Sequence, residues 1–477
     1  MRATREDELV TAEHEPVTQS GAAPRSASEP EPYPSTLYAW YCVILLLGIY
    51  LNSFLDRQML ALVVGPIKTT MGLTDSQVGF LMGPAFALFY TVAGLPLGWL
   101  ADRMSRRVLI GVGQVAWSIA SACFGLGNNY TQLVTARVGV GVGEASLGPS
   151  AYSVIADLFP PHRLARAMSV YGMGIYIGGG LANLVGGLLT GWFSAEQTYT
   201  VPIFGERMGW QVIFLMTALP VLPLTLLLPT LREPKRRAVG VVRDASGQAR
   251  PMTVPFSMFL SYVWLNRRTM FCHCFGFAFL SFSGYGAGAW LPEFFIRVHG
   301  WTRAEVGVSL GVASMTIGPA GLLLGGYLSD RFAAHGHRDA KLRAGVISAV
   351  AWLPFGVAAP LVDDGVLAYV LLLPGILLTA MPWGIAPAAV QEIMPNQMRG
   401  QASGVYLFII NMLGLAGGPI ALALLTDYVF RDEKQIHLSL VWTTTVAHIL
   451  SAILLLAGLK AYRESRDRLD EWLRVHS

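Results

Sequence analysis

The chain has 477 residues, of which 53% are hydrophobic and only 13% charged, whereas an ordinary soluble domain carries about 25% charged residues. Apolar runs of about 20 residues, long enough to cross a bilayer as a helix, recur almost to the C-terminal end. The net charge is +4, and the basic residues cluster in short loops instead of forming a stripe. These properties exclude a soluble globular protein and a nucleic-acid partner, and they predict a multi-pass protein of the membrane bilayer.

The sequence divides into five segments. A polar N-terminal stretch, rich in Glu, Ser, Pro and Ala, predicts a disordered tail. Hydropathy predicts six spans before a basic, polar stretch and six after it. The twelve spans lie near 38–64, 76–101, 107–128, 131–156, 165–193, 211–231, 268–292, 304–329, 344–362, 366–391, 400–427 and 438–460. The expected domains are a tail (1–36), a six-helix bundle (37–231), a cytoplasmic linker (232–267), a second six-helix bundle (268–462) and a C-terminal tail (463–477).

Basic residues alternate between the two sets of loops, and this alternation orients the chain. One set of loops is rich in Lys and Arg and includes the linker, while the other set is poor in them. The rich side is expected to be cytoplasmic, with both termini inside. On the poor side, Glu293 follows a proline at the outer end of its span and is expected to be a solvated carboxylate.

An internal repeat is visible in the sequence itself. GWLADR (98–103) matches GYLSDR (326–331) at an offset of 228, and Thr74 matches Thr302 at the same offset. AMSVY (167–171) matches ASGVY (402–406) at an offset of 235. Ordered matches at nearly one offset predict duplicated six-helix halves, and parallel repeats of this kind place a binding site between the halves, near the bilayer midplane.

The chain resembles the major facilitator superfamily, and within it the spinster-like lipid transporters. The resemblance lies in FLDRQ (54–58), GWLADRMSRR (98–107), and most specifically RVGVGVGEAS (137–146) with IADLF (155–159). It implies an all-α membrane protein with two pseudo-symmetric six-helix bundles, working as a monomer in a bacterial inner membrane. The sequence departs from the superfamily loop at Ser105, where glycine is usual, and the second copy of the loop lacks the basic pair.

Four ionisable residues fall inside predicted spans of the first half, namely Asp56, Arg57, Arg137 and Glu144. A charge near the centre of a membrane helix costs about 2.5 to 3.5 kcal/mol on insertion scales, so such residues normally face a cavity or a partner. Arg137 and Glu144 are two helical turns apart and share a face. By the family resemblance, Asp56, Arg137 and Glu144 are expected to form a proton-responsive cluster on the central cavity. The alternative is a permanently ionised structural network, and Arg57 is expected to point toward the edge of the bundle or toward a neighbouring helix.

The loop after the second span carries a basic cluster at the cytoplasmic membrane edge. This cluster is interpreted as a latch that closes the inner gate, and the corresponding acid–base pair of the second half carries the same interpretation. The alternative is a topogenic cluster with no moving part. The gate candidates are Asp102, Arg103, Arg106, Arg107, Asp330 and Arg331.

In the second half, no Lys or Arg lies in a predicted span within residues 344–391 and 400–426, and the only acidic residues there, Asp363 and Asp364, fall between spans. This part of the chain is expected to give the cavity an apolar wall. His273 is a candidate for binding a polar headgroup, with a packing histidine as the alternative. Trp383, Phe408 and Asn411, with nearby glycines, are the candidates for the wall. An ionisable half facing an apolar half suits an amphiphile, with its headgroup near the charges and its acyl chain on the opposite side.

The sequence therefore predicts a secondary transporter of a lysophospholipid or a sphingoid-type lipid, working by alternating access with protons as coupling ions. A multidrug exporter and an organic-anion symporter are the transporter alternatives. No GxxxxGK[ST] motif occurs, so ATP is not the direct energy source. No GxSxG or HExxH motif supports an enzyme acting on lipid, and neither a catalytic residue, a metal nor a cofactor is expected.

Overall fold

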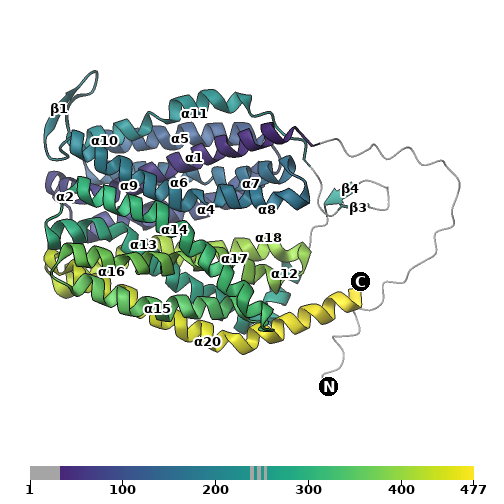
Figure 1. Ribbon diagram of the computed structural model, residues 1–477. Helices are drawn as coiled ribbons and strands as arrows, with labels where there is room; N and C mark the ends of the chain where they lie inside the picture. The colour runs from purple at the N-terminus through teal and green to yellow at the C-terminus, as the bar shows by residue number, and fades with distance from the viewer. Residues whose placement is uncertain (1–32, 237–240, 244–248, 252–254, 477) are drawn as a thin grey trace.

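The computed structural model describes residues 33–236, 241–243, 249–251 and 255–476. The predicted disordered tail lies almost wholly outside these residues. The described chain is mainly helical, with one small hairpin between α9 and α10 and a second in the linker (Figure 1). The hairpins pair β1 (Thr198–Val201) with β2 (Gly205–Met208) and β3 (Val241–Arg243) with β4 (Ala249–Pro251).

The helices form two groups that lie one above the other in Figure 1. The first group, here the N half, contains α1 (Thr36–Leu62), α2 (Val64–Met71), α3 (Asp75–Met82), α4 (Pro84–Ala101), α5 (Arg106–Leu126), α6 (Tyr130–Glu144), α7 (Leu147–Leu158), α8 (Pro161–Gly172), α9 (Gly174–Trp192), α10 (Gly209–Ala218), α11 (Val221–Leu227) and the short turn η2 (Leu228–Thr230).

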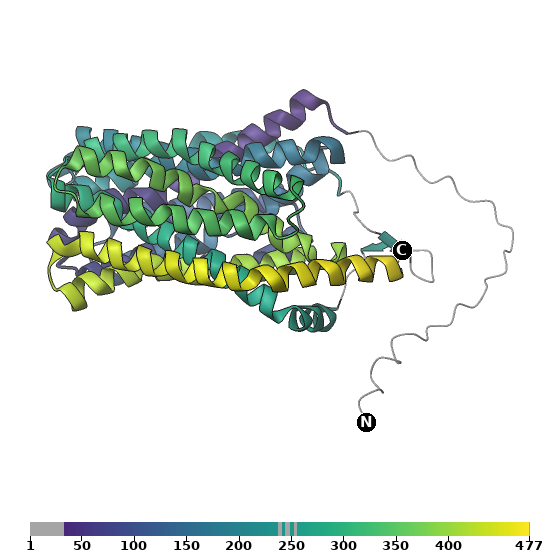
Figure 2. The same cartoon turned by 60° about the horizontal axis from the view of Figure 1, so that its bottom comes forward.

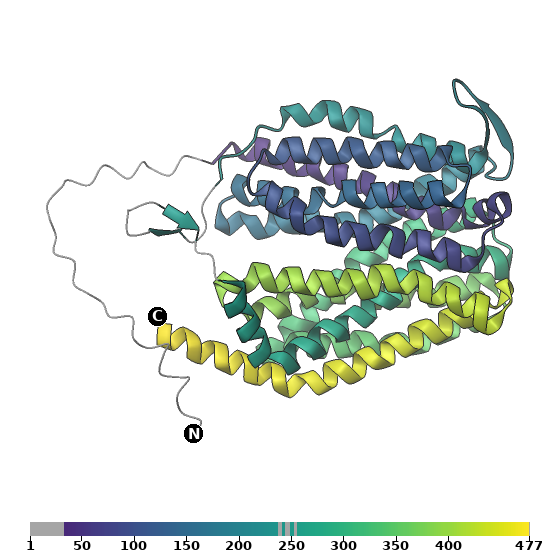
Figure 3. The same ribbon diagram turned by 180° about the vertical axis from the view of Figure 1, so that it is seen from behind.

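The second group, here the C half, follows the linker and is seen from behind in Figure 3. It contains α12 (Phe256–Leu265), α13 (Arg267–His299), α14 (Arg303–Ala334), α15 (Ala340–Leu361), α16 (Gly365–Ala380), α17 (Pro382–Glu392), α18 (Arg399–Ile409), α19 (Gly417–Leu424) and α20 (Ile436–His476), with short turns at η3 (Asn396–Met398) and η6 (Glu433–Gln435) and π-helical segments at η4 (Ile410–Ala416) and η5 (Leu425–Phe430).

Ten helices, some of them joined end to end, are long and apolar enough to cross a membrane among the described residues. The predicted spans at 131–156 and 268–292 are helical but are not among the ten. The first is divided between α6 and α7, and the second lies within the 33-residue helix α13. The count of twelve spans therefore stays a prediction. The C-terminal segment is not separate from the last span, since α20 continues through it and extends beyond the other helices (Figure 2).

The repeat seen in the sequence has a structural counterpart at the start of α3 and α14. Thr74 accepts a hydrogen bond from the backbone of Gln77, and Gln77 bonds back to the backbone of Thr74. Thr302 and Glu305 form the same reciprocal capping box in the C half. Each box satisfies backbone donors that a helix N-terminus leaves free, so the two matched threonines begin equivalent helices.

The two halves approach most closely along α9 and α14, where glycines replace side chains. A Cβ atom on Gly180 would lie 2.7 Å from the carbonyl oxygen of Gly311, and one on Gly307 would lie 2.5 Å from the Cα of Gly187. Such distances are shorter than real Cβ contacts, so the two backbones meet only because no side chain intervenes. This α9–α14 contact is called the seam below.

Glycines also hold the charged helix α6 in place. A Cβ on Gly141 would lie 2.6 Å from the carbonyl oxygen of Phe86 on α4, and one on Gly143 would lie 2.7 Å from the backbone nitrogen of Trp117 on α5. The GVGVGE stretch therefore lets α6 fit between two helices at backbone distance. This packing fixes the positions of Arg137 and Glu144.

We expect Gly143→Ala to destabilise the protein by about 1 to 3 kcal/mol, because its new methyl group overpacks the contact with α5. Thermal unfolding in detergent measures this as a lower midpoint temperature. Gly148→Ala is the matched control, because nothing lies within 4 Å of a Cβ at that position. Equal midpoints for the two variants would show that the close α5–α6 contact is not needed.

Candidate functional site

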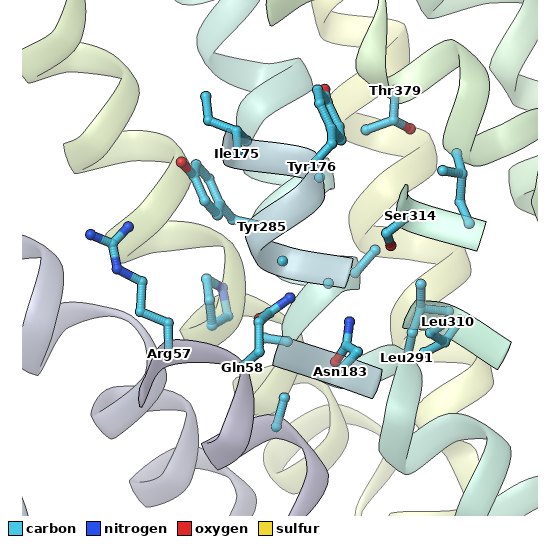
Figure 4. Close-up of a pocket in the computed structure, with 18 of the residues that line it drawn as sticks. Arg57, Gln58, Ile175, Tyr176, Asn183, Tyr285, Leu291, Leu310, Ser314 and Thr379 are labelled. Carbon is cyan, nitrogen blue, oxygen red and sulfur yellow. The ribbon is translucent and has the colours of Figure 1, made fainter. Parts of the chain in front are cut away.

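A cavity of about 270 Å³ lies between the two halves and is lined by residues of both. On the N half, α1 contributes Phe54, Arg57, Gln58 and Ala61, which follow the helical spacing of one face. Figure 4 shows Arg57 and Gln58 on this side, with Asn183 on α9 beside them. The C half contributes mainly apolar and aromatic residues, among them Tyr285, Leu291, Leu310, Trp352, Leu372, Ile376 and Trp383.

The charged residues on the cavity wall are Arg57 and Arg137, and no Asp or Glu is among the described residues that line it. Arg57 is held from behind by Glu144, whose carboxylate accepts hydrogen bonds from the Arg57 Nε, at 2.8 Å, and from its Nη2. The Glu144 side chain is 1% exposed, and its Oε1 atom has no hydrogen-bond partner among the described residues. The wall facing a ligand is therefore cationic, with its counter-charge buried behind it.

Aromatic rings complete the surroundings of Arg57. Its guanidinium carbon lies 4.6 Å from the centroid of Phe86 and 5.2 Å from that of Tyr90. Cation–π contacts of this kind stabilise a guanidinium most where water is excluded. Of the two orientations expected for Arg57, the structure shows the contact with a neighbouring helix, through Glu144 on α6. The helical phase of α1 also brings Arg57 to the cavity wall.

Glu144 is the last residue of α6, and α7 begins at Leu147 after a short break. A helix C-terminus carries a partial negative charge and unsatisfied carbonyl groups, so it disfavours a carboxylate and favours a cation. Arg57 supplies that cation. The break and the ion pair thus depend on one another, and Arg57 neutralises both the carboxylate and the helix end.

Asp56 and Arg137 take up a different arrangement from the predicted cluster. The Asp56 carboxylate accepts hydrogen bonds from Ser121 on α5 and Thr217 on α10, at 2.5 Å and 3.3 Å, and it does not line the cavity. Arg137 donates to the backbone carbonyls of Leu81, from Nε at 3.2 Å, and of Asp56, from Nη1 at 3.2 Å. The structure brings Asp56 and Arg137 into contact, but the hydrogen-bonded partner of Glu144 is Arg57, not Arg137.

The four candidates for the substrate cavity are divided by the structure. Trp383 lines the cavity, where its ring meets Tyr285 edge-on at 5.6 Å. His273 does not, because it is fully buried against Phe277 and Tyr406. Its ring nitrogens have no hydrogen-bond partner among the described residues.

Phe408 and Asn411 are also absent from the residues that line this cavity, and Phe408 is 43% exposed. Phe408 lies on α18, whereas Asn411 lies in the π-helical segment η4. The wider turn of a π-helix changes which side chains face inward, and Leu415 and Pro419 line the cavity in this part of the chain.

Two further C-half residues of the wall are positioned by a histidine that the sequence did not single out. His448 on α20 stacks on Trp352 at 3.9 Å, and its Nε2 lies 3.1 Å from the hydroxyl of Ser283. Its Nδ1 lies 3.1 Å from the carbonyl of Ala349, so Nδ1 carries the proton and Nε2 accepts from Ser283. His448 fixes the orientation of two side chains that line the cavity.

The ends of the molecule differ in how the halves are joined. At the α2 end, Arg297 on α13 makes a bidentate pair with Asp75 on α3, at 2.6 Å and 2.9 Å. Lys68 joins Asp75 to Glu433 at 2.5 Å and 2.6 Å. These residues, together with Glu293, are called the α2-end network, and they connect the two halves across the cavity mouth.

Glu293 strengthens this closure instead of being solvated as expected. It is 1% exposed, accepts from Arg297 at 2.7 Å, and accepts from the backbone N–H of Gly65 at 3.1 Å. That N–H is free because the chain breaks between α1 and α2. In the same way, Asp427 of the C half accepts from the backbone of Ser76 at the start of α3, at 2.6 Å.

At the linker end, the strongest ion pairs lie within one half. Arg106 is fully buried and binds Asp157 and Glu233, while Lys341 binds Glu392 of its own half. Arg107 donates to the carbonyls of Pro229 and Leu231. The gate candidates of the first half therefore hold the start of the linker against their own half.

The remaining gate candidates contribute less. Arg103 stacks on Trp99 at 4.0 Å, and Arg331 donates to Tyr327 at 3.2 Å. Asp102 is exposed and caps α4 as the residue after its end, whereas its counterpart Asp330 lies within α14. A latch between the halves at this end stays a prediction. Such a latch belongs to a conformation in which the two halves meet at the linker end of the molecule.

Two helical halves around one cavity, joined at one mouth and held separately at the other, define a membrane transporter of the alternating-access type. The sequence agrees with that class. The model of the Major Facilitator Superfamily matches residues 46–419, and the chain belongs to this superfamily.

The relatives of this chain carry names that describe different kinds of transporter. An MFS-type efflux pump of Mycolicibacterium smegmatis is 28% identical over 91% of this chain and 95% of its own length. A probable L-galactonate transporter of Escherichia coli is 26% identical over 63% of this chain and 64% of its length. The human protein spinster homolog 1 is 26% identical over 83% of this chain and 75% of its length.

Among solved structures, a bacterial homologue of the human lysosomal transporter spinster, in an inward-facing and occupied conformation, superposes with a TM-score of 0.71. The two chains are 25% identical, and the match covers 91% of this chain and 97% of that one. The chain is thus a member of the Major Facilitator Superfamily that is similar to spinster proteins in sequence and in fold, which is the resemblance that the sequence motifs indicated.

We expect Arg297→Gln to open the α2 end. It leaves Asp75 and Glu293 buried without their shared cation, and an uncompensated buried charge costs about 3 to 5 kcal/mol. Spin labels at positions 69 and 363, exposed residues of opposite halves at this end, report the opening as a longer distance by double electron–electron resonance. Lys434→Gln, at an exposed position of the same end, is the control. An unchanged distance in both variants would contradict a closing role for the network.

We expect Glu233→Gln to loosen the linker. Burial alone raises the pKa of Glu233, but hydrogen bonds from the Arg107 backbone, Arg106 and Ser105 outweigh it and lower the pKa. A lowered pKa means that the carboxylate stabilises docking fully above pH 4.5, its ordinary pKa, and that this stabilisation is lost as pH falls through the lowered value. Trypsin cleavage at Lys235 and Arg236 measures the docking.

Cleavage is expected to be faster in Glu233→Gln at neutral pH. Glu464→Gln, at an exposed position of α20, is the control and is expected to leave cleavage unchanged. If both variants are cut at the wild-type rate, Glu233 does not hold the linker.

Proposed function

We propose that the protein is a secondary active transporter of an anionic amphiphile, a lysophospholipid or sphingoid-type lipid, coupled to protons. The proposal rests first on the charge of the cavity wall. Arg57 and Arg137 face the ligand space, and no carboxylate does among the described lining residues. Opposite charges attract strongly where water is excluded, so this wall favours an anionic head group over a cationic one.

The shape of the C-half wall supports an acyl chain as the second part of the ligand. Leu291, Leu310, Leu372 and Ile376 form an apolar surface opposite Arg57. Burying alkyl surface there is favourable by about 0.8 kcal/mol for each methylene group. A head group at the arginines and a tail on this surface use both halves of the cavity.

Proton coupling follows from the charge balance behind the wall. Asp56, Arg57, Arg137 and Glu144 carry two positive and two negative charges when ionised, which sum to zero. Protonation of Glu144 leaves Arg57 without its partner, and an anionic ligand can then replace the carboxylate. The proton and the anion enter together, so the cavity gains no net charge in low-dielectric surroundings.

The observed joining of the halves fits one stage of this cycle. With both termini cytoplasmic, as the loop charges predict, the α2 end is the outer end and the cavity faces inward in this structure. Opening the outer end requires the ion pairs between Arg297, Asp75, Lys68 and Glu433 to break. A bound ligand changes the populations only by binding the two states differently.

An organic-anion symporter is the second candidate, because a small acid can also bind Arg57 and because the relatives include a probable L-galactonate transporter. The two functions differ in the use of the apolar wall. A lipid substrate predicts rates that rise with acyl-chain length, whereas a sugar acid predicts transport with no chain at all. An exporter of cationic drugs is disfavoured by the two wall arginines.

The direct test is lysolipid uptake into proteoliposomes, read as the fraction that albumin no longer extracts from the outer leaflet. We expect Arg57→Gln to reduce uptake at least tenfold, because the head group loses its charged partner. Arg268→Gln, which removes an exposed arginine outside the cavity, is the control. Uptake of galactonate or of a cationic dye in place of any lysolipid would contradict the proposal.

The coupling test uses the same assay with and without a pH gradient. Glu144→Gln resembles the protonated state, so we expect its uptake to lose the dependence on the gradient. Asp56→Asn is expected to keep that dependence, because the Asp56 carboxylate faces Ser121 and Thr217 and not Arg57. If Asp56→Asn alone loses it, Asp56 is the coupling site, and if neither variant does, the cluster does not couple protons.

A further inference from the structure

Next to Arg57 and Arg137, the cavity wall carries a row of uncharged polar side chains. Gln58 follows Arg57 on α1, Asn183 lies on α9, and Ser314 lies on α14 (Figure 4). A Cβ on Gly179, one turn before Asn183, would lie 3.8 Å from the Gln58 amide nitrogen. The two carboxamides therefore share one patch of the wall, here called the amide shelf together with Ser314.

The side chains of the amide shelf are unpaired and aimed at the cavity. None of the three hydrogen-bonds to another side chain or backbone group among the described residues, although Asn183 is only 6% exposed. Polar groups buried to this degree are nearly always hydrogen-bonded. The cavity contains polar groups whose natural partner is a ligand.

The amide shelf crosses the seam between the halves. Asn183 lies between Gly180 and Gly187, the α9 glycines that contact α14, and Ser314 comes one turn after Gly311 on α14. A ligand bound to Asn183 and Ser314 therefore touches both halves where their backbones are closest. Its contacts must change when the halves separate, which is how a ligand acquires different affinities for the two states.

The chemistry of the shelf is specific for hydroxyl groups. A carboxamide donates and accepts hydrogen bonds, and a hydroxyl group does the same, so two neighbouring amides match a diol. A quaternary ammonium has no hydrogen to donate and meets two arginines with no carboxylate on the wall. A bare phosphate satisfies the arginines but leaves the amides unpaired, and sites with unpaired polar groups discriminate strongly against such ligands.

We propose that the amide shelf binds the hydroxyl groups of a polyol carried by the anionic head group. The preferred substrates are then lysolipids whose phosphate is a diester of glycerol or a similar polyol. The inference rests on the proposed function, since it assumes a head group at Arg57. It adds that Gln58, Asn183 and Ser314 choose among anionic lipids.

The experiment compares three lysolipids with the same palmitoyl chain in the proteoliposome assay, namely lysophosphatidylglycerol, lysophosphatidic acid and lysophosphatidylcholine. We expect the glycerol lipid to be taken up at least tenfold more efficiently than the other two, measured as kcat/KM. Gln58→Leu and Asn183→Leu are expected to lower its uptake to the level of lysophosphatidic acid. The readout is the ratio of the two uptakes, and we expect uptake of lysophosphatidic acid to fall by a smaller factor than uptake of the glycerol lipid.

Lysophosphatidic acid serves as the internal control for folding, because a misfolded variant loses uptake of both lipids. Ser314→Ala is expected to reduce the preference by a smaller factor than either leucine variant. Thr316→Val is its matched control, because Thr316 lies two residues away, is exposed on the outside of α14, and bonds its hydroxyl to the carbonyl of Val312.

Two results would overturn the inference while leaving the proposed function in place. One is equal wild-type uptake of the glycerol and phosphate lipids, and the other is an equal loss of both in the leucine variants. If no anionic lysolipid is taken up at all, the proposed function fails and the inference fails with it.

Discussion

The ion pair between Arg57 and Glu144 is the interaction on which the cavity depends. Glu144 ends α6 inside the membrane, where a carboxylate and a helix C-terminus would otherwise repel. Arg57 offsets both, and its own charge is in turn covered by Phe86 and Tyr90. Removing either partner leaves an uncompensated charge in a low-dielectric site, so the pair can separate only when another charge or a proton arrives.

That dependence explains why the surrounding scaffold is built from glycine contacts. Gly141 and Gly143 bring α6 to backbone distance from α4 and α5, and no flexible side chain intervenes. A charge pair whose energy falls off with distance requires such rigid placement. The seam uses the same means between the two halves, because Gly187 and Gly307 let their backbones meet with no side chain between them at that point.

The sequence predicted the fold and the presence of buried charges, because both depend on composition and on short motifs. The paired capping boxes at Thr74 and Thr302 show that the repeat offset of 228 was structural. The partners of the charges were harder to predict. Asp56 and Arg57 are adjacent and point about 100° apart on a helix, and of these two only Arg57 lines the cavity. Hydropathy does not say which one does.

Other errors came from breaks in regular geometry. Asn411 lies in the π-helical segment η4, whose wider turn changes which side chains face the cavity, whereas Trp383, near the start of α17, does line the wall. A π-turn has no sequence signature comparable to a capping box. Glu293 was misjudged because its burial involves Gly65 of the other half, whereas Arg297 lies one turn away on the same helix.

The ion pairs that must break when the conformation changes lie at the α2 end. Arg106 and Lys341 keep their partners in any arrangement of the halves, since those partners move with them. Arg297 and Lys68 lose theirs when the α2 end opens. An ion-pair network that is too strong would trap one state, because moving a two-state equilibrium from 1:99 to 99:1 takes about 5.5 kcal/mol of differential binding. The free energy needed to open the α2 end is therefore balanced against the binding free energy that a ligand gains at the seam, where it contacts both halves. The same few hydrogen bonds then contribute both to substrate selection and to the conformational change.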